Sequence, residues 1–208
     1  MHDENTLAER LLEVIELDIL PLTKSGVAAG NKIFGAALLR KESLETFLAE
    51  TNNEMENPLW HGEMHALKRF YEIPASQRPN TSDLIFLSTH EPCSLCLSAI
   101  TWCGFDNFYY FFSHEDSRDS FSIPHDLKIL KEVFGREDYR TKNEFWTSRA
   151  VNDLISTSPN PDSLISRARI ISQQYDDLSS LYQSAKACLL YTSPSPRDAT
   201  LSRMPSSA

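Results

Sequence analysis

Two short motifs carry the side chains best suited to chemistry. His61-Gly62-Glu63 supplies an imidazole and a carboxylate, and Pro92-Cys93-Ser94-Leu95-Cys96, about thirty residues later, supplies two thiols. One imidazole and two thiolates form the set of three protein ligands that a catalytic zinc ion uses when its fourth position stays open for water. The motifs therefore predict a Zn²⁺ site with His61, Cys93 and Cys96 as its ligands.

The spacing within each motif indicates which element holds it. The two cysteines are three positions apart, so on a helix both thiols lie on one face. Pro92 suits the first position of that helix, where its missing N–H is harmless. Asn57 and Pro58 predict a similar helix start, with His61 in its first turn. A positive helix end also lowers the pKa of a thiol and favours the ligating thiolate.

Glu63 is predicted to be catalytic. It lies two positions from His61, so on a helix it points away from the imidazole, yet it stays close enough to exchange protons with water at the metal. The run from His61 to His65 is not the zincin motif, in which the glutamate directly follows the first histidine. His65 is accordingly expected to be a structural histidine.

The order H-x-E followed by P-C-x-x-C is the signature of zinc nucleobase deaminases, in which the glutamate acts as general acid and base without binding the metal. The sequence matches every position of this signature and so resembles the cytidine deaminase-like superfamily over about residues 28–134. The resemblance implies an α/β protein with a three-layer α-β-α fold, a mixed sheet of about five strands, a Zn²⁺ cofactor and hydrolytic release of ammonia.

Further residues indicate a branch of that superfamily. The segments 34–37 and 91–100 resemble the opening strand and the cysteine motif of guanine deaminases and tRNA adenosine deaminases, and Trp102 is similar to a residue of guanine deaminases. Gly62 instead resembles fungal-type cytosine deaminases, which carry H-G-E. The motifs are thus closest to the guanine deaminase and tRNA adenosine deaminase branch, while the base stays open between guanine-like and cytosine-like.

Three residues are predicted to bind the substrate. In the proteins that the sequence resembles, an asparagine at the end of the second strand hydrogen-bonds the base, which implies Asn52, with the adjacent Asn53 as the alternative. Trp60 and His90 each lie next to the catalytic motifs. They either shape the substrate pocket or belong to the core.

Composition and charge limit the partners. The 208 residues carry a formal net charge of −9, whereas nucleic-acid binding usually needs a basic surface. We therefore expect a small-molecule nucleobase or nucleoside as partner and consider nucleic acid unlikely. Two alternatives remain: a tRNA adenosine-to-inosine editing deaminase, and a non-catalytic, zinc-stabilised partner subunit, against which the intact Glu63 argues.

The sequence also predicts a cytoplasmic protein without a membrane segment. No run of eighteen apolar residues occurs, and the first residues are acidic, unlike a signal or transit peptide. Four cysteines, two of them assigned to the metal, leave no disulfide framework.

Residues 1–155 are predicted to form the deaminase domain. A capping box at Thr6 to Glu9 predicts a helix that Pro21 stops, and residues 145–155 suit a strand or a short helix equally. The remaining apolar patterns predict a strand hairpin at 33–51, helices after His61 and at the cysteine motif, strands at 84–89 and 107–112, and a helix at 124–134.

Residues 156–187 are predicted to form a helical C-terminal extension. Its apolar residues are spaced alternately by four and three: Leu164, Ala168, Ile171, Tyr175, Leu178, Tyr182 and Ala185. The helix either docks on the domain or mediates self-association in a possible homodimer. Residues 188–208 resemble the translation of a sequencing adapter and are interpreted as a non-native tail, the alternative being a natural Ser/Pro-rich tail.

Overall fold

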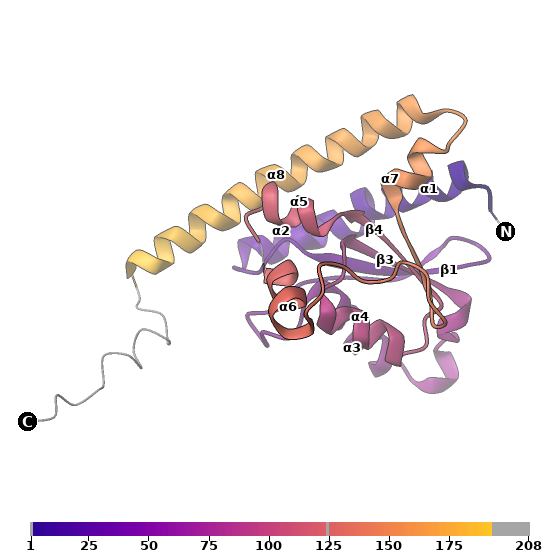
Figure 1. The fold of residues 1–208 in the computed structure, drawn as a ribbon, viewed down its shortest axis with the longest axis horizontal. Helices are drawn as coiled ribbons and strands as arrows, with labels where there is room; N and C mark the ends of the chain where they lie inside the picture. Colours follow the sequence, from indigo (N-terminus) through magenta and orange to yellow (C-terminus); the bar gives the residue numbers. More distant parts are fainter. Residues whose placement is uncertain (1, 124, 193–208) are drawn as a thin grey trace, which may run out of the picture.

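The computed structural model describes residues 2–123 and 125–192, and it is built on a mixed five-stranded sheet in the order β2-β1-β3-β4-β5 (Figure 1). β1 pairs antiparallel with β2 and β3, whereas β4 is parallel to both β3 and β5. The strands are β1 (Gly35–Arg40), β2 (Thr46–Thr51), β3 (Leu84–His90), β4 (Asn107–Phe112) and β5 (Thr147–Ala150).

Helices cover both faces of the sheet, which confirms the predicted three-layer α/β architecture (Figure 1). One layer contains α1 (Glu4–Val14), the π-helical η1 (Ile15–Ile19), α2 (Leu20–Ala28), α7 (Val151–Ser156) and α8 (Pro161–Thr192). The opposite layer contains α3 (Gly62–Glu72), α4 (Ser94–Trp102) and α6 (His125–Phe134). The short elements are η2 (Ala75–Gln77), η3 (Thr81–Asp83) and α5 (His114–Asp119). Each layer packs its own apolar cluster against the sheet.

The N-terminal helix differs from the prediction at both ends. Its N-cap is Asp3, whose carboxylate accepts the Thr6 N–H at 2.9 Å, so the expected capping box at Thr6 is wrong. Pro21 does not stop the helix. The chain widens into η1, where the Leu20 N–H donates to the Ile15 carbonyl, and Pro21 then lies in the first turn of α2, where no N–H is required.

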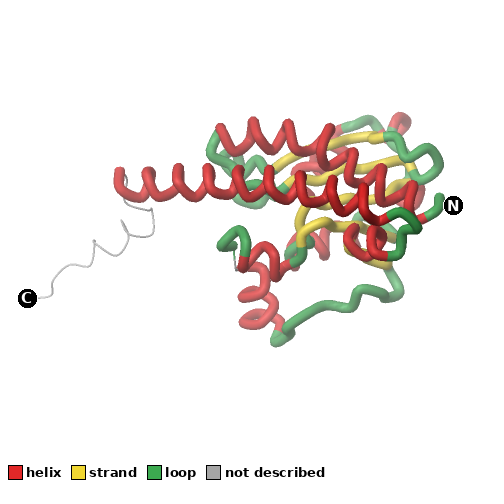
Figure 2. The backbone as a smooth tube through the Cα atoms, turned by 90° about the horizontal axis from the view of Figure 1, so that it is seen from above, coloured by secondary structure: helices red, strands yellow, loops and turns green. Residues whose placement is uncertain are grey.

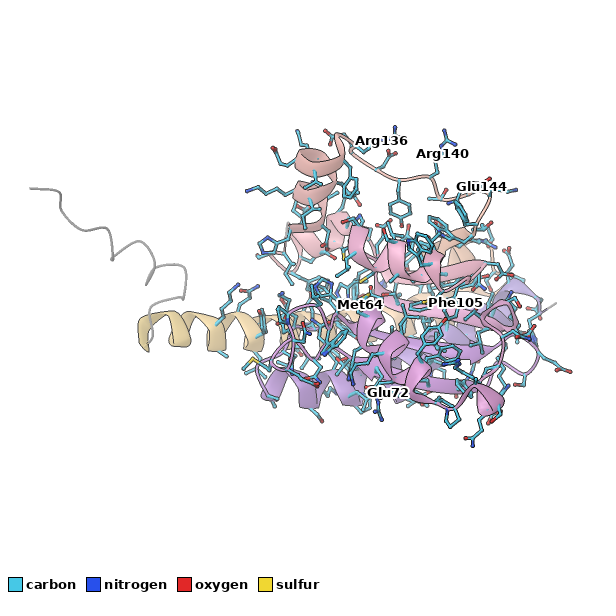
Figure 3. All side chains as sticks on the ribbon, turned by 90° about the horizontal axis from the view of Figure 1, so that it is seen from below. Met64, Glu72, Phe105, Arg136, Arg140 and Glu144 are labelled. Atoms are coloured by element: carbon cyan, nitrogen blue, oxygen red, sulfur yellow. The ribbon has the colours of Figure 1, made fainter. Side chains whose placement is uncertain are left out.

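Residues 145–155 contain both of the elements that the pattern left open. β5 extends the parallel part of the sheet, with Thr147 opposite Asn107, and α7 begins directly after it. Between α6 and β5 the chain forms a long connection that carries Arg136, Arg140 and Glu144 past the side of α4 that faces away from Met64 and Glu72 of α3 (Figure 3).

The C-terminal helix α8 lies along α1 and α2 (Figure 2). The predicted seam faces the domain from Leu164 to Leu178, while Tyr182 is half-buried and Ala185 exposed. The first residue predicted for the helix at 124–134 and most of the predicted tail, residues 193–208, lie outside the described part of the chain. Within the described residues, no helix combines the length and the apolar character that a membrane span requires.

Gly62 fixes how closely α3 approaches β1. A Cβ at this position would lie 2.6 Å from the Cα and 2.8 Å from the backbone nitrogen of Gly35, and neither atom can rotate away. We expect Gly62→Ala to lower the free energy of unfolding by about 1–3 kcal/mol, the cost of overpacking a closed core, in urea titrations. Gly26→Ala is the matched control: the nearest atom to its Cβ would be Cγ2 of the Thr51 side chain at 3.2 Å, the nearest backbone atom, the Asn52 carbonyl oxygen, would lie at 3.8 Å, and the substitution gains helix propensity. Equal stability of the two variants would contradict this account of the close approach.

Candidate active site and metal centre

The N-termini of α3 and α4 bring the three predicted ligands together. His61 is the N-cap residue of α3, Cys93 is the N-cap residue of α4, and Cys96 lies in the first turn of α4. The His61 Nδ1 lies 3.5 Å from the Cys93 Sγ and 3.7 Å from the Cys96 Sγ, and the two sulfur atoms are 3.6 Å apart. His61 and Cys93, which are 32 residues apart in the sequence, are thus neighbours in the structure.

The helix starts themselves were predicted slightly wrongly. Pro92 precedes the N-cap of α4, and Asn57 and Pro58 belong to a turn before α3, in which the Asn57 side chain accepts the Leu59 N–H at 3.0 Å. In both helices the metal ligand itself occupies the N-cap. The side chains of these two N-cap residues approach to 3.5 Å between the starts of the two helices.

The donor set fits a zinc ion. One ligand atom from each of His61, Cys93 and Cys96 lies within 4.8 Å of the others, and all three come from residue types that bind zinc. The neighbouring Cys96 thiol and His61 imidazole lower the pKa of Cys93 to about 4, against the opposing effect of burial. Cys93 is therefore held as a thiolate, while the same contact and burial raise the pKa of Cys96.

Glu63 lies beside this group in the first turn of α3, and only 4% of it is exposed. Its Oε1 accepts the Ser88 hydroxyl at 2.8 Å, and its Oε2 accepts the Cys96 thiol at 3.4 Å. Burial raises the pKa of Glu63 to about 6. A carboxyl group whose pKa lies near neutrality can both accept and return a proton.

Asn52 follows β2 and is buried next to the metal group. Its Oδ1 accepts the Gly62 N–H at 2.6 Å, so the amide caps the helix that carries His61 and Glu63. Its Nδ2 is buried and has no hydrogen-bond partner among the residues that the structure describes. The amide thus leaves one unused donor at the site.

A small cavity opens onto the metal group. Its volume is about 20 Å³, enough for roughly one water molecule. The lining residues are Phe34, His61, Glu63, His90, Glu91, Cys93 and Asp126. A nucleobase is far larger than one water molecule, so it reaches Glu63 only when side chains of this lining move.

The structure separates two of the predicted substrate contacts. His90 lines the cavity and is buried, whereas Trp60 is half-buried outside the lining, with the Lys68 ammonium 5.9 Å from its ring centroid. His65 is a structural residue, as expected: its Nδ1 lies 2.9 Å from the Thr51 carbonyl oxygen.

Sequence reasoning missed Asp126. This residue lies in the first turn of α6, more than thirty residues after Cys93, and α6 brings it to the cavity rim. Burial and the nearby Cys93 sulfur raise its pKa to about 6. No motif marks it in the sequence, where it follows an acidic loop; only the packing of α6 near α4 places it.

Burial of His90 predicts a pH dependence of stability. Its pKa falls from about 6.5 in the unfolded chain to about 3, because burial disfavours the charged ring. The unfolded state therefore binds more protons below pH 6.5, and this residue's contribution to stability is lost as the pH falls from 6.5 toward 3.

When the pH falls from 7.5 to 5, we expect protonation of His90 in the unfolded state to lower the free energy of unfolding by about 2 kcal/mol. Urea titrations at both pH values give the change in unfolding free energy with pH for the wild type and for His90→Leu. Subtracting the change of the variant from that of the wild type isolates the effect of His90, because the effect of the metal ligands is the same in both proteins. A loss of equal size in both proteins would show that the His90 ring is not kept neutral by the fold.

Comparison with known proteins places the site in a family. Residues 13–112, which include all three ligands and Glu63, match the family described as the cytidine and deoxycytidylate deaminase zinc-binding region. No curated protein sequence matches the chain.

Several solved structures of deaminases are similar to the chain. Guanine deaminase from Nitrosomonas europaea is 19% identical, with 76% of this chain and 81% of that chain covered and a TM-score of 0.46. A tRNA:A34 deaminase is 16% identical, with coverages of 73% and 94% and a TM-score of 0.46. The dCMP deaminase of cyanophage S-TIM5 is 16% identical, with coverages of 66% and 97% and a TM-score of 0.37.

The fold and the site together define a zinc protein in which two helix N-termini hold one histidine and two cysteines against a mixed sheet. Residues 13–112 match the cytidine and deoxycytidylate deaminase zinc-binding region, and the cofactor of the site within them is Zn²⁺.

Proposed function

We propose that this protein is a zinc-dependent hydrolytic deaminase of a free nucleobase or nucleoside, with a guanine-like or cytosine-like base. The observation that supports this proposal is the position of the Glu63 carboxylate, which is buried, hydrogen-bonded to Ser88 and 3.4 Å from the Cys96 sulfur. A scaffold subunit has no chemical use for a buried carboxyl group beside its metal ligands.

His61, Cys93 and Cys96 hold the zinc ion, which supplies Lewis-acid activation of water at neutral pH when it is bound. Glu63 accepts a proton from the attacking water at its carboxylate and donates it to the ring nitrogen of the base. The Glu63 carboxylate then takes the remaining proton from the hydroxyl group that has been added to the ring carbon and passes it to the amino group, so that the C–N bond breaks, ammonia departs and a carbonyl forms. The hydrogen bond from Ser88 to Oε1 fixes the orientation of the carboxylate during both transfers.

Three polar groups are available to bind the base. Asp126 and His90 line the cavity, where the Asp126 carboxylate can accept from ring N–H or amino groups. The unused Nδ2 of Asn52 is buried outside the lining and can donate to a ring carbonyl or nitrogen once the lining has moved. Trp60, outside the cavity lining, can contact only a part of the substrate that extends beyond the base, such as a ribose.

Ammonia release tests the proposal. We expect the zinc-loaded protein to turn over one compound among guanine, cytosine, adenine, guanosine, cytidine and adenosine, and Glu63→Ala to abolish that turnover. Release from tRNA alone would instead support the editing alternative. Inactivity on the whole panel and on tRNA, with one zinc ion bound per chain, would favour the non-catalytic subunit.

A further inference from the structure

The C-terminal helix α8 reaches the wall of the active-site cavity through one side chain. Tyr175 lies in the middle of the buried seam of α8 and is fully buried. Its ring centroid lies 5.6 Å from that of His90 and 5.3 Å from that of Phe112. Although α8 packs on the sheet face opposite to α3 and α4 (Figure 1), it therefore touches a residue that lines the metal cavity.

The position of His90 explains this contact. His90 is the last residue of β3, at the C-terminal end of the central strand of the sheet. Its ring is surrounded by aromatic rings at centroid distances of 4.6 to 5.6 Å: Phe34, Phe112, Phe121 and Tyr175. Packing on several sides restrains the imidazole, and Tyr175 is the contact that comes from the C-terminal helix.

Hydrogen bonding restrains the same ring. The His90 Nδ1 lies 3.0 Å from the Thr89 hydroxyl oxygen, which also accepts the Gly35 N–H at 2.9 Å. The His90 Nε2, on the other edge of the ring, is buried and has no partner among the described residues. A buried polar atom without a partner is costly, and a substrate group is one means of satisfying it.

We propose that Tyr175 is a positioning residue: its ring holds the His90 imidazole with Nε2 free for a polar group of the base, so that the C-terminal helix forms part of the substrate site. The proposal rests on the proposed deaminase function for its substrate. It makes no use of the Tyr175 hydroxyl, which likewise has no hydrogen-bond partner among the described residues.

Steady-state kinetics on the best substrate of the panel test this role. We expect Tyr175→Leu to raise KM by about 3- to 10-fold, the range that one neutral hydrogen bond supplies, with a smaller change in kcat and with zinc retained. Tyr175→Phe keeps the ring and should restore the wild-type KM.

The control variant is Ile171→Ala, which empties a fully buried position of the same seam one turn earlier. It should lower the melting temperature without raising KM. In a His90→Leu background, Tyr175→Leu should have no further effect on KM, because the two residues act through one contact. A KM for Tyr175→Leu equal to that of Ile171→Ala, or effects of Tyr175→Leu and His90→Leu that simply add, would overturn the proposal.

A second readout separates this inference from the proposed function. The imidazole ¹⁵N resonances of His90 report its tautomer and surroundings without any substrate. They should move in Tyr175→Leu and stay in place in Tyr175→Phe and Ile171→Ala. A wild type that deaminates nothing would overturn the proposed function. Independently of that result, unchanged His90 resonances in Tyr175→Leu would overturn the positioning role of Tyr175.

Discussion

Glu63→Ala should keep the zinc ion and lose the activity. The substitution leaves His61, Cys93 and Cys96 in place, so zinc content should stay at one ion per chain. The proton path is lost, however, because Glu63 is the buried carboxyl group that contacts both Ser88 and Cys96. General acid–base catalysis by one residue contributes about 10²- to 10⁴-fold, and kcat should fall by at least that factor.

Zinc analysis and kcat, measured on the same preparations, check this expectation. Glu63→Gln is the informative companion because it keeps the shape and the Ser88 contact but cannot carry the proton. It should be as inactive as Glu63→Ala. If Glu63→Gln retained wild-type kcat, the proton-transfer role of Glu63 would be wrong; zinc loss in Glu63→Ala would instead show that the carboxyl group supports the metal site.

Cys96→Ala should release the zinc ion and destabilise the domain. Cys96 is fully buried between Cys93, His61 and Glu63, so its loss removes one ligand and leaves a void at the start of α4. Metal that binds only the folded state at 100 times its Kd stabilises that state by about 2.7 kcal/mol. The variant should lose at least this amount and respond no longer to added zinc.

Thermal unfolding with and without a chelator measures the loss. Cys103→Ala is the matched control, since Cys103 is the C-cap residue of the same helix and lies outside the metal group. It should bind zinc and lose stability on chelation as the wild type does. A Cys96→Ala protein that still gained stability from zinc would contradict the assignment of this thiol as a ligand.

The sequence was sufficient to predict the metal group and the fold because both depend on local patterns. The H-x-E and P-C-x-x-C spacings place their side chains at helix starts wherever those helices lie, and the strands predicted at 84–89 and 107–112 are marked by the apolar runs 84–87 and 108–112. The family match over residues 13–112 covers this same region.

What could not be predicted depends on packing between distant segments. Pro21 normally marks a helix end, but a π-helical turn before it lets the helix continue along the sheet. Asp126 comes to the cavity on α6, and Tyr175 packs against His90 from α8, although nothing near either residue in the sequence marks a site. Trp60, by contrast, is adjacent to His61 in the sequence but lies outside the cavity lining.

The most direct test of the central claim is the incorporation of oxygen from water during turnover. In H₂¹⁸O, the zinc-loaded protein should form a product with one ¹⁸O atom in place of the amino group for each ammonia released, and Glu63→Ala should form none. Ammonia release without ¹⁸O in the product, or equal labelling by Glu63→Ala, would contradict a hydrolytic deaminase that uses Glu63.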